Sequence, residues 1–308
     1  MYREKQFDAF VLAIGNAKFL QKANGMIKDL KFRGVTKILI FQNLEGRGTF
    51  QWLDCRKSFI RYLESNLIDA CNLNCKACTH FAGLFKRDEI YPIDEFTRDI
   101  QAVSDSVDVQ RFRLLGGEPF LLENLDEYIN IARKIFTQTI ISVVTNGLLI
   151  PTADQKIFSS LRQNSVSLFI SKYPPTLKIQ TQIEEILNHE GIKFNFGRQI
   201  EEFHKVINDG TKINDPLIAR ECCFNNNCRF LRHGKIYKCP IDALKFRFAE
   251  KFHLNYPPAT GVDVHAKNFT QMLEMLDGNV DQCFFCTNKI SMTPWQPLSN
   301  PTAQDWIA

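Results

Sequence analysis

Three cysteines on one short loop are the residues in this chain best suited to chemistry. Cys71, Cys75 and Cys78 follow a C-x3-C-x2-C spacing, and His80 comes shortly after them. Three thiolates at this spacing can bind three irons of a [4Fe–4S] cube and leave the fourth iron open to another molecule. The alternative is a zinc knob, in which His80 completes a tetrahedral set of ligands.

A second motif lies downstream, where an apolar strand ends in Gly116, Gly117 and Glu118. Residues without a Cβ let a ligand approach the backbone, and a carboxylate binds an ammonium group through a charge-assisted hydrogen bond. A strand-to-loop glycine pair alone would not explain the cysteines upstream.

Two further apolar segments also end in polar residues, the first at Thr145 and Asn146 and the second at Ser171. Together with the cysteine triplet and the Gly-Gly-Glu segment, they resemble the radical S-adenosylmethionine (SAM) enzymes. In that family the open iron chelates SAM, and an electron from the cluster splits SAM into methionine and a 5′-deoxyadenosyl radical. The resemblance implies that the Gly-Gly-Glu segment contacts the methionine ammonium and that Thr145, Asn146 and Ser171 lie along SAM.

Strand-like and helical segments alternate after the cysteine loop, which predicts right-handed βαβ units and a parallel sheet. The resemblance implies an α/β fold with a partial (β/α)6 TIM-like barrel of radical SAM type, with ligands at the carboxyl ends of its strands. Strands are expected at residues 60–67, 112–115, 140–145, 166–171 and 192–196, with a sixth near 204–207, and helices at 94–103, 125–136, 154–161 and 179–189.

The chain divides into three parts by pattern. Residues 1–54 read as a small N-terminal βαβ extension, with strands at 9–15 and 37–41, a helix at 17–30 and a linker at 45–49. Residues 55–215 are assigned to the radical SAM partial barrel, and residues 216–308 to a C-terminal module and tail.

The C-terminal part holds six of the ten cysteines, and a glycine-centred β-hairpin at 230–237 is expected to bring several of them together. Their order resembles the twitch module, the half-SPASM unit that binds one auxiliary [4Fe–4S] cluster in many radical SAM enzymes. A zinc ribbon is the alternative. The resemblance implies Cys239, Cys283 and Cys286 as ligands together with Cys223, while Cys222 and Cys228 stay possible in the place of Cys223. The isolated Cys55 is interpreted as a packing residue.

Composition excludes several classes of protein. A net charge of +4 is too small to indicate a nucleic-acid partner, and no apolar run is long enough to span a membrane. Clustered cysteines in a chain of 308 residues favour metal over disulfides, and the N-terminus does not resemble a signal peptide. A cytoplasmic location follows as an expectation.

The resemblance implies an oxidoreductase that abstracts a hydrogen atom from a small molecule, most simply a sugar, aminosugar or cyclitol. Either a dehydrogenase leaves a carbonyl, which is the favoured outcome, or an epimerase returns a hydrogen from a thiol such as Cys222 or Cys228. His80 is a weaker candidate for a proton acceptor. The alternative function is maturation of a ribosomal peptide through thioether or carbon–carbon crosslinks.

A flavodoxin or ferredoxin is the expected electron donor. A run of basic residues beside the C-terminal cysteines could bind such an acidic protein. The run consists of Lys235, Lys238, Lys245, Arg247 and Lys251.

Overall fold

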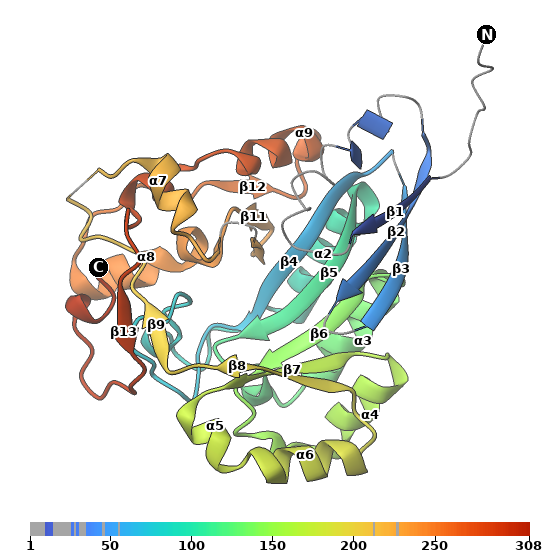
Figure 1. The fold of residues 1–308 in the computed structure, drawn as a ribbon, viewed down its shortest axis with the longest axis horizontal. Coiled ribbons are helices and arrows are strands. Elements are labelled where there is room, and N and C mark those ends of the chain that lie inside the picture. Colours follow the sequence, from blue (N-terminus) through green and yellow to red (C-terminus); the bar gives the residue numbers. More distant parts are fainter. Residues whose placement is uncertain are drawn as a thin grey trace.

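A computed structural model describes residues 10–14, 26–27, 29–30, 35–44, 47–54, 56–211, 213–225 and 228–308. An eight-stranded sheet in the order β12-β11-β10-β4-β5-β6-β7-β8 forms the centre of the molecule (Figure 1). Five neighbouring strands are parallel, as the sequence predicts: β4 (Ser58–Ile68), β5 (Val107–Gly116), β6 (Ile140–Thr145), β7 (Ser167–Lys172) and β8 (Phe194–Gln199).

Amphipathic helices follow these strands and cover one face of the sheet. Their starts have local causes: Asp94 and Glu95 lie in the first turn of α2, and Asp154 caps α4 by accepting a hydrogen bond from the Lys156 amide. The helices are α2 (Ile93–Ser106), α3 (Leu125–Ile135), α4 (Gln155–Gln163), α5 (Pro174–Lys178) and α6 (Gln180–His189).

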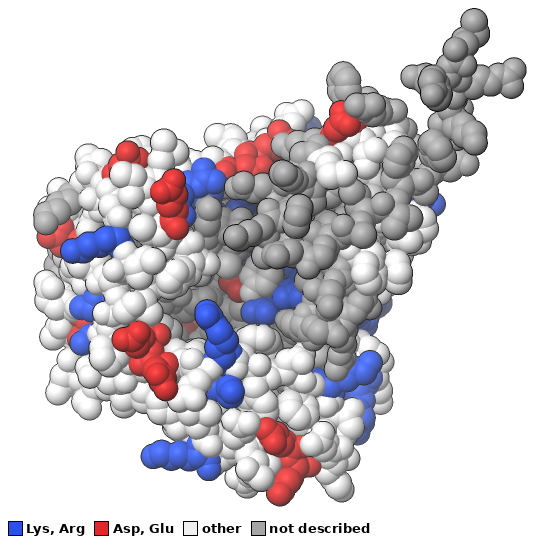
Figure 2. Space-filling model, viewed as in Figure 1, with Lys and Arg blue, Asp and Glu red and all other residues white. Residues whose placement is uncertain are grey.

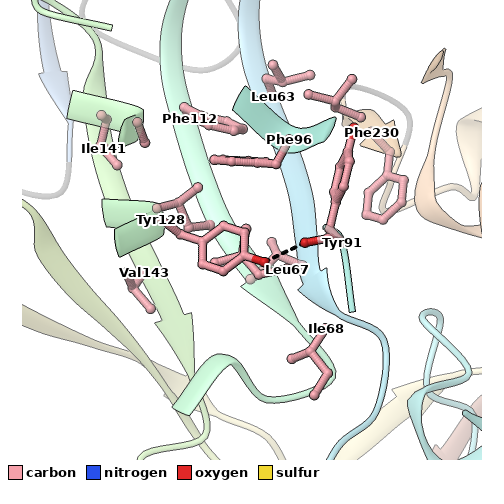
Figure 3. Close-up of a cluster of buried hydrophobic side chains, with 14 of the residues drawn as sticks. Leu63, Leu67, Ile68, Tyr91, Phe96, Phe112, Tyr128, Ile141, Val143 and Phe230 are labelled. Carbon is pink, nitrogen blue, oxygen red and sulfur yellow. Dashed lines mark hydrogen bonds between the residues drawn. The ribbon is translucent and has the colours of Figure 1, made fainter. Parts of the chain in front are cut away.

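The main core lies between these helices and the sheet (Figure 3). Leu63 of β4 and Phe112 of β5 are partners in register and are completely buried. The ring of Phe96 from α2 stacks on Phe112 at 6.4 Å and meets Tyr128 of α3 edge-on at 5.2 Å. Each such buried side chain contributes about 1.5–3 kcal/mol, so this face fixes the strands that carry the site.

Alternate residues of the same strands point to the opposite side, which we call the inner face. There, register pairs Glu64 of β4 with Arg113 of β5, Arg113 with Ser142 of β6, and Ser142 with Ser167 of β7. Because neighbours in register share a face of a sheet, these four residues form one polar row.

The prediction of a sixth barrel strand near residues 204–207 is wrong. Residues 202–204 form β9 (Glu202–His204), which pairs antiparallel with β13 (Met292–Pro294) away from the large sheet. The place beside β4 is taken instead by β10 (Arg229–Arg232), which runs parallel to it. The barrel sheet therefore ends at β8 on one side and continues into the C-terminal part on the other.

The predicted hairpin is confirmed. Strand β10 pairs antiparallel with β11 (Lys235–Tyr237), and the turn residues His233 and Gly234 have φ values of 44° and 69°. Two consecutive positive φ values are typical of the type I′ turns that close tight hairpins. The C-terminal part also contains β12 (Gly261–Asp263), α7 (Pro216–Glu221), α8 (Pro240–Phe252) and α9 (Phe269–Leu273).

The N-terminal segment forms a separate sheet of β1 (Phe10–Ile14), β2 (Lys37–Leu44) and β3 (Arg47–Asp54). Strands β1 and β2 are parallel, as expected for the two strands of a βαβ unit. The expected linker is wrong for residues 47–49, because they begin β3, which pairs antiparallel with β2. Most of the helix expected at 17–30, two residues of that linker and Cys55 lie outside the described residues.

In the described part of the chain, no helix has the length and apolar character needed to cross a membrane.

Candidate functional site

The cysteine loop begins just after β4, at the carboxyl end of the parallel strands. Hydrogen-bond donors are directed at its sulfur atoms: the Leu73 amide lies 3.3 Å from Cys71 Sγ, and the indole Nε1 of Trp295 lies 3.2 Å from Cys75 Sγ. The backbone N–H groups of residues 80–82 act on Cys78 in the same way and lower its pKa. Burial outweighs these donors and raises the pKa of all three thiols, that of Cys75 to about 12.

This donor set fits an iron–sulfur cluster. The three thiols are free of disulfides, and charge on Cys75 or Cys78 raises the pKa of Cys71. Such crowded, buried thiols ionise when a metal supplies positive charge, and N–H groups around the sulfurs stabilise the resulting thiolates. Cys71, Cys75 and Cys78 would hold the cluster.

The glycine pair makes room for this loop. A Cβ on Gly116 would lie 2.2 Å from the carbonyl oxygen of Ile68, and one on Gly117 would lie 2.1 Å from that of Ala70. The amides of Gly117 and Glu118 donate to those same two carbonyls. In this structure the missing side chains admit the backbone of Ile68 and Ala70, and contact of the glycines with a ligand stays a prediction.

Glu118 lies at the centre of the strand ends and is completely buried. Its Oε1 accepts hydrogen bonds from Thr145 Oγ1 at 2.7 Å and the Phe120 amide at 3.1 Å, and its Oε2 accepts one from the Asn146 amide at 2.8 Å. Burial raises the pKa of Glu118 to about 7, against the opposing effect of these three donors. A carboxylate has about four acceptor positions, so one remains on Oε2 for a further donor such as an ammonium group.

The other predicted SAM contacts lie at neighbouring strand ends. Asn146 Nδ2 donates to Asn72 Oδ1 of the cysteine loop at 2.7 Å, and Thr176 Oγ1 holds the Asn146 carbonyl at 2.7 Å. Ser171 hydrogen-bonds to Tyr173, a tyrosine whose pKa burial and the charges of the loop cysteines raise. The structure thus brings the strand ends after β5, β6 and β7 to one side of the cysteine loop, and their contacts with SAM stay a prediction.

The C-terminal tail clasps the cysteine loop, which the sequence did not predict. The Lys76 amide donates to the Gln296 carbonyl at 3.0 Å, and the Leu298 amide donates to the Asn74 carbonyl at 2.7 Å. Trp306 Nε1 donates to the Cys78 carbonyl at 2.9 Å. The tryptophans of the tail were the sequence signal for these contacts, because buried indole N–H groups usually find a hydrogen-bond acceptor.

One ring nitrogen of His80 contacts Asn66 and not a cysteine sulfur. Its Nδ1 lies 3.1 Å from Asn66 Oδ1, and its ring meets Phe230 edge-on at 5.7 Å. Burial lowers the pKa of His80 to about 4, which makes it a weak base.

Four C-terminal cysteines influence one another electrostatically. The charges of Cys223 and Cys286 raise the pKa of Cys239, and those of Cys223 and Cys283 raise the pKa of Cys286. Gln282 Nε2 also lies 3.6 Å from Cys286 Sγ. These four thiols fit the ligand set of an auxiliary cluster, and the part of Cys223 in it, in preference to Cys222, stays a prediction.

Cys228 lies between this set and the inner face. It comes just before Arg229, which is the register partner of Leu63, and two residues before Phe230, which pairs with Glu64. Burial raises the pKa of Cys228, and the charges of Glu64, Cys239 and Cys223 raise it further, while Arg113 lowers it. The Cys228 thiol is therefore coupled electrostatically both to Glu64 on the inner face and to the auxiliary cysteines.

The prediction that the basic run forms a docking surface for the electron donor is wrong. Lys238 is buried with its Nζ 2.9 Å from the Leu276 carbonyl, and Lys245 is buried against Asp242 at 2.6 Å. Arg247 is paired with Glu89 and Glu250. Those three residues are thus engaged within the protein and do not form a positive surface for an electron donor.

Comparison with known proteins agrees with this geometry. Residues 65–189 match the family model described as the radical SAM superfamily. Similar curated proteins are the GTP 3′,8-cyclases of Alkaliphilus oremlandii, 32% identical over 94 residues (30% of this chain and 29% of that protein), and Desulforamulus reducens, 36% identical over 95 residues (29% and 28%). The matched part thus spans less than a third of these relatives.

Similar solved structures include BtrN in complex with AdoMet and 2-DOIA, at a TM-score of 0.47 and 14% identity, covering 76% of this chain and 98% of that one. Streptococcus suis SuiB bound to S-adenosylmethionine has a TM-score of 0.38 and 17% identity, covering 58% and 38%. The superfamily uses a [4Fe–4S] cluster and S-adenosylmethionine, and the cysteine loop and strand ends described above lie within or beside the matched residues. Residues 65–189 of this chain form a radical SAM domain.

Proposed function

We propose that this radical SAM enzyme oxidises an alcohol carbon of a sugar, aminosugar or cyclitol to a carbonyl. The observation that carries the proposal is the position of Cys228, two residues before Phe230, the register partner of Glu64; the charges of Glu64, Cys239 and Cys223 all raise the pKa of this thiol. An electron acceptor held by that set would lie close to a substrate on the inner face. Oxidation needs such an acceptor, whereas hydrogen abstraction alone does not.

The residues of the chain divide the work. Cys71, Cys75 and Cys78 would hold the cluster that, when bound with SAM, supplies the 5′-deoxyadenosyl radical for hydrogen abstraction. Glu118, fixed by three hydrogen bonds, would orient SAM through its remaining acceptor position. Trp295 and the tail exclude water from one side of the cysteine loop.

Epimerisation is the second candidate, and the same cysteine favours it. Cys228 is a free thiol beside Glu64 and need not be an auxiliary ligand if Cys223 takes that place. A thiol in that position could return a hydrogen atom to a carbon radical. No contact among the described residues favours peptide maturation in the same way. The match to the GTP cyclase covers 30% of this chain, which is too little to imply the same reaction.

The electron donor and the location also belong to this proposal. A flavodoxin or ferredoxin would supply the electron, by a surface other than the cationic run. A cytoplasmic location rests on the sequence alone.

Incubation with SAM, dithionite and a candidate sugar in deuterated water separates the two outcomes. Dehydrogenation gives a product about two mass units lighter than the substrate, without carbon-bound deuterium, whereas epimerisation through a thiol adds about one unit. Cys228→Ser is the diagnostic variant: it should leave dehydrogenation intact. Deuterium incorporation that disappears in Cys228→Ser, at unchanged iron content, would overturn the dehydrogenase in favour of the epimerase.

A further inference from the structure

The inner face carries a buried carboxylate that the SAM site does not use. Glu64 is 7% exposed and lies beside Arg113 in register. The hydroxyl of Tyr62, two residues earlier on β4, donates to Glu64 Oε1. A carboxylate buried in a strand needs polar partners, so its presence on this face requires an explanation.

Arg113 is held between two aromatic rings. Its guanidinium carbon lies 5.1 Å from the centre of the Tyr62 ring and 4.4 Å from that of Phe169 on β7. Stacking of this kind fixes the plane of the guanidinium and directs its N–H groups toward the edges of the two rings. The same Tyr62 thus positions both Glu64 and Arg113.

The next residue in the row, Ser142, points to a missing ligand. Ser142 is 1% exposed, and its buried hydroxyl has no hydrogen-bond partner among the described residues. An unsatisfied buried hydroxyl costs about 1–3 kcal/mol, so native proteins rarely keep one without a ligand or water beside it. Glu64 also has acceptor positions beyond the one that Tyr62 occupies.

The charges of the row favour a neutral ligand. Burial raises the pKa of Glu64, whereas Tyr62 and the positive charge of Arg113 lower it. One acid and one base side by side leave little net charge to attract an ion, but they offer strong acceptors and donors to hydroxyl groups. Figure 2 shows basic and acidic side chains close together in a hollow at the centre of the molecule, viewed as in Figure 1.

We propose that Glu64, Arg113 and Ser142 bind a neutral polyhydroxylated ring, a sugar or cyclitol without an ionic group, and that Glu64 accepts the proton of the hydroxyl that is oxidised. This inference rests on the proposed dehydrogenation and names its substrate class and its base. The carbinol carbon would lose a hydrogen atom to the SAM-derived radical, its hydroxyl would lose a proton to Glu64, and an oxidised cluster held by the auxiliary cysteines would take the remaining electron. The C–H and O–H bonds break and the carbon–oxygen double bond forms.

The position of Glu64 suits this role better than that of His80. Cys228, which Glu64 influences directly, is in turn influenced by Cys239 and Cys223. Glu64 is the register partner of Phe230 on β10, and Cys228 comes two residues before Phe230, so the sheet brings Glu64 close to the segment that carries Cys228. His80, by contrast, has Nδ1 against Asn66 and its ring against Phe230.

The test is calorimetric binding to anaerobically reconstituted protein with SAM and without reductant. Three probes of similar ring size are used: myo-inositol (neutral), glucosamine (cationic) and glucose 6-phosphate (anionic). We expect myo-inositol to bind most tightly. Glu64→Gln and Ser142→Ala should each weaken it by about tenfold or more, as the loss of a hydrogen bond to a buried polar group predicts. The exposed Glu127→Gln, on α3, is the charge-matched control and should bind like the wild type.

A second readout separates binding from a structural effect. Infrared difference spectra should show a carboxyl band that changes when myo-inositol binds and that is missing in Glu64→Gln. Unchanged binding in both Glu64→Gln and Ser142→Ala would overturn the site, as would failure of all three probes to bind protein that holds SAM. Tighter binding of glucosamine or glucose 6-phosphate would overturn the neutral class.

The proposed reaction can be refuted independently of the proposed binding site. Binding that depends on Glu64 and Ser142, followed by deuterium incorporation and no carbonyl product, would uphold the substrate class and overturn both dehydrogenation and the role of Glu64 as proton acceptor. Carbonyl formation at the wild-type rate in Glu64→Gln would overturn that role alone.

Discussion

Replacement of Trp295 by phenylalanine tests whether the tail tunes the cluster. Trp295 Nε1 donates to Cys75 Sγ at 3.2 Å, and the indole ring stacks on Tyr173 with centroids 6.2 Å apart. Phenylalanine keeps an aromatic ring against Tyr173 and removes the N–H donor. The backbone amide of this residue, which donates to the Glu201 carbonyl at 2.7 Å, is unaffected by the change.

The expected effect is a more negative reduction potential. A hydrogen bond to a charged acceptor contributes about 1.5–3 kcal/mol, and only the part that grows when the cluster gains an electron affects the potential. If that part is about 1 kcal/mol, the midpoint falls by about 40 mV, because a one-electron couple shifts by about 59 mV per 1.4 kcal/mol. Loss of the donor destabilises the reduced state more than the oxidised one, which sets the sign.

The assay is a redox titration of anaerobically reconstituted protein followed by electron paramagnetic resonance, without SAM. Trp306→Phe is the matched control, since Trp306 Nε1 donates to the Cys78 carbonyl and not to a sulfur. It should lower the thermal midpoint of unfolding and leave the potential nearly unchanged. A midpoint that does not move in Trp295→Phe, or that moves equally in Trp306→Phe, would refute this reasoning.

Three other predictions follow from the site. Because the pKa of Glu118 is raised from 4.5 to about 7, the native state keeps a proton that the unfolded chain loses. The stability of the metal-free protein should therefore fall by about 3 kcal/mol as the pH rises from 4.5 to 7, and urea unfolding should show no such slope in Glu118→Gln. Gly117→Ala, which would place a Cβ 2.1 Å from the Ala70 carbonyl oxygen, should cost about 1–3 kcal/mol and lower the iron content after reconstitution; normal iron and normal stability would contradict it. Cys223→Ala should remove about four irons per chain while Cys222→Ala removes none, and the reverse pattern would reassign the ligand.

The parallel part of the fold could be predicted because its signals are local. Strands β4 to β8 read as apolar segments between amphipathic helices, and Asp154 marks the start of α4 by its own side chain. The hairpin of β10 and β11 was predictable for the same reason, since Gly234 tolerates the positive φ that its turn requires.

The other parts depend on partners far away in the chain. Strands β9 and β13 have three residues each, too few for a periodic pattern, and each forms only against the other. The cationic run failed because burial of α8 decides the state of its charges: Lys245 lies within one turn of Asp242 and pairs with it inside the protein. The sequence shows the spacing that allows Lys245 to pair with Asp242, but it does not show that the pair is buried.

The inner face shows a different limit. Glu64 and Arg113 each look like an ordinary charge within a strand, and only the register of β4 and β5 places them side by side. A lone charge in a strand segment usually indicates an exposed edge. The pairing that makes them a site is a property of the assembled sheet.

The clasp on the cysteine loop also sets an order of events during synthesis. Asn74, Cys75 and Cys78 leave the ribosome more than 200 residues before the groups that hold them, since the bonds from Leu298, Trp295 and Trp306 span 224, 220 and 228 positions. Until those last residues emerge, the barrel can fold while the three thiols stay uncovered on one side. Delivery of iron and sulfide to the open loop can then precede docking of the tail, whose hydrogen bonds to the loop form last.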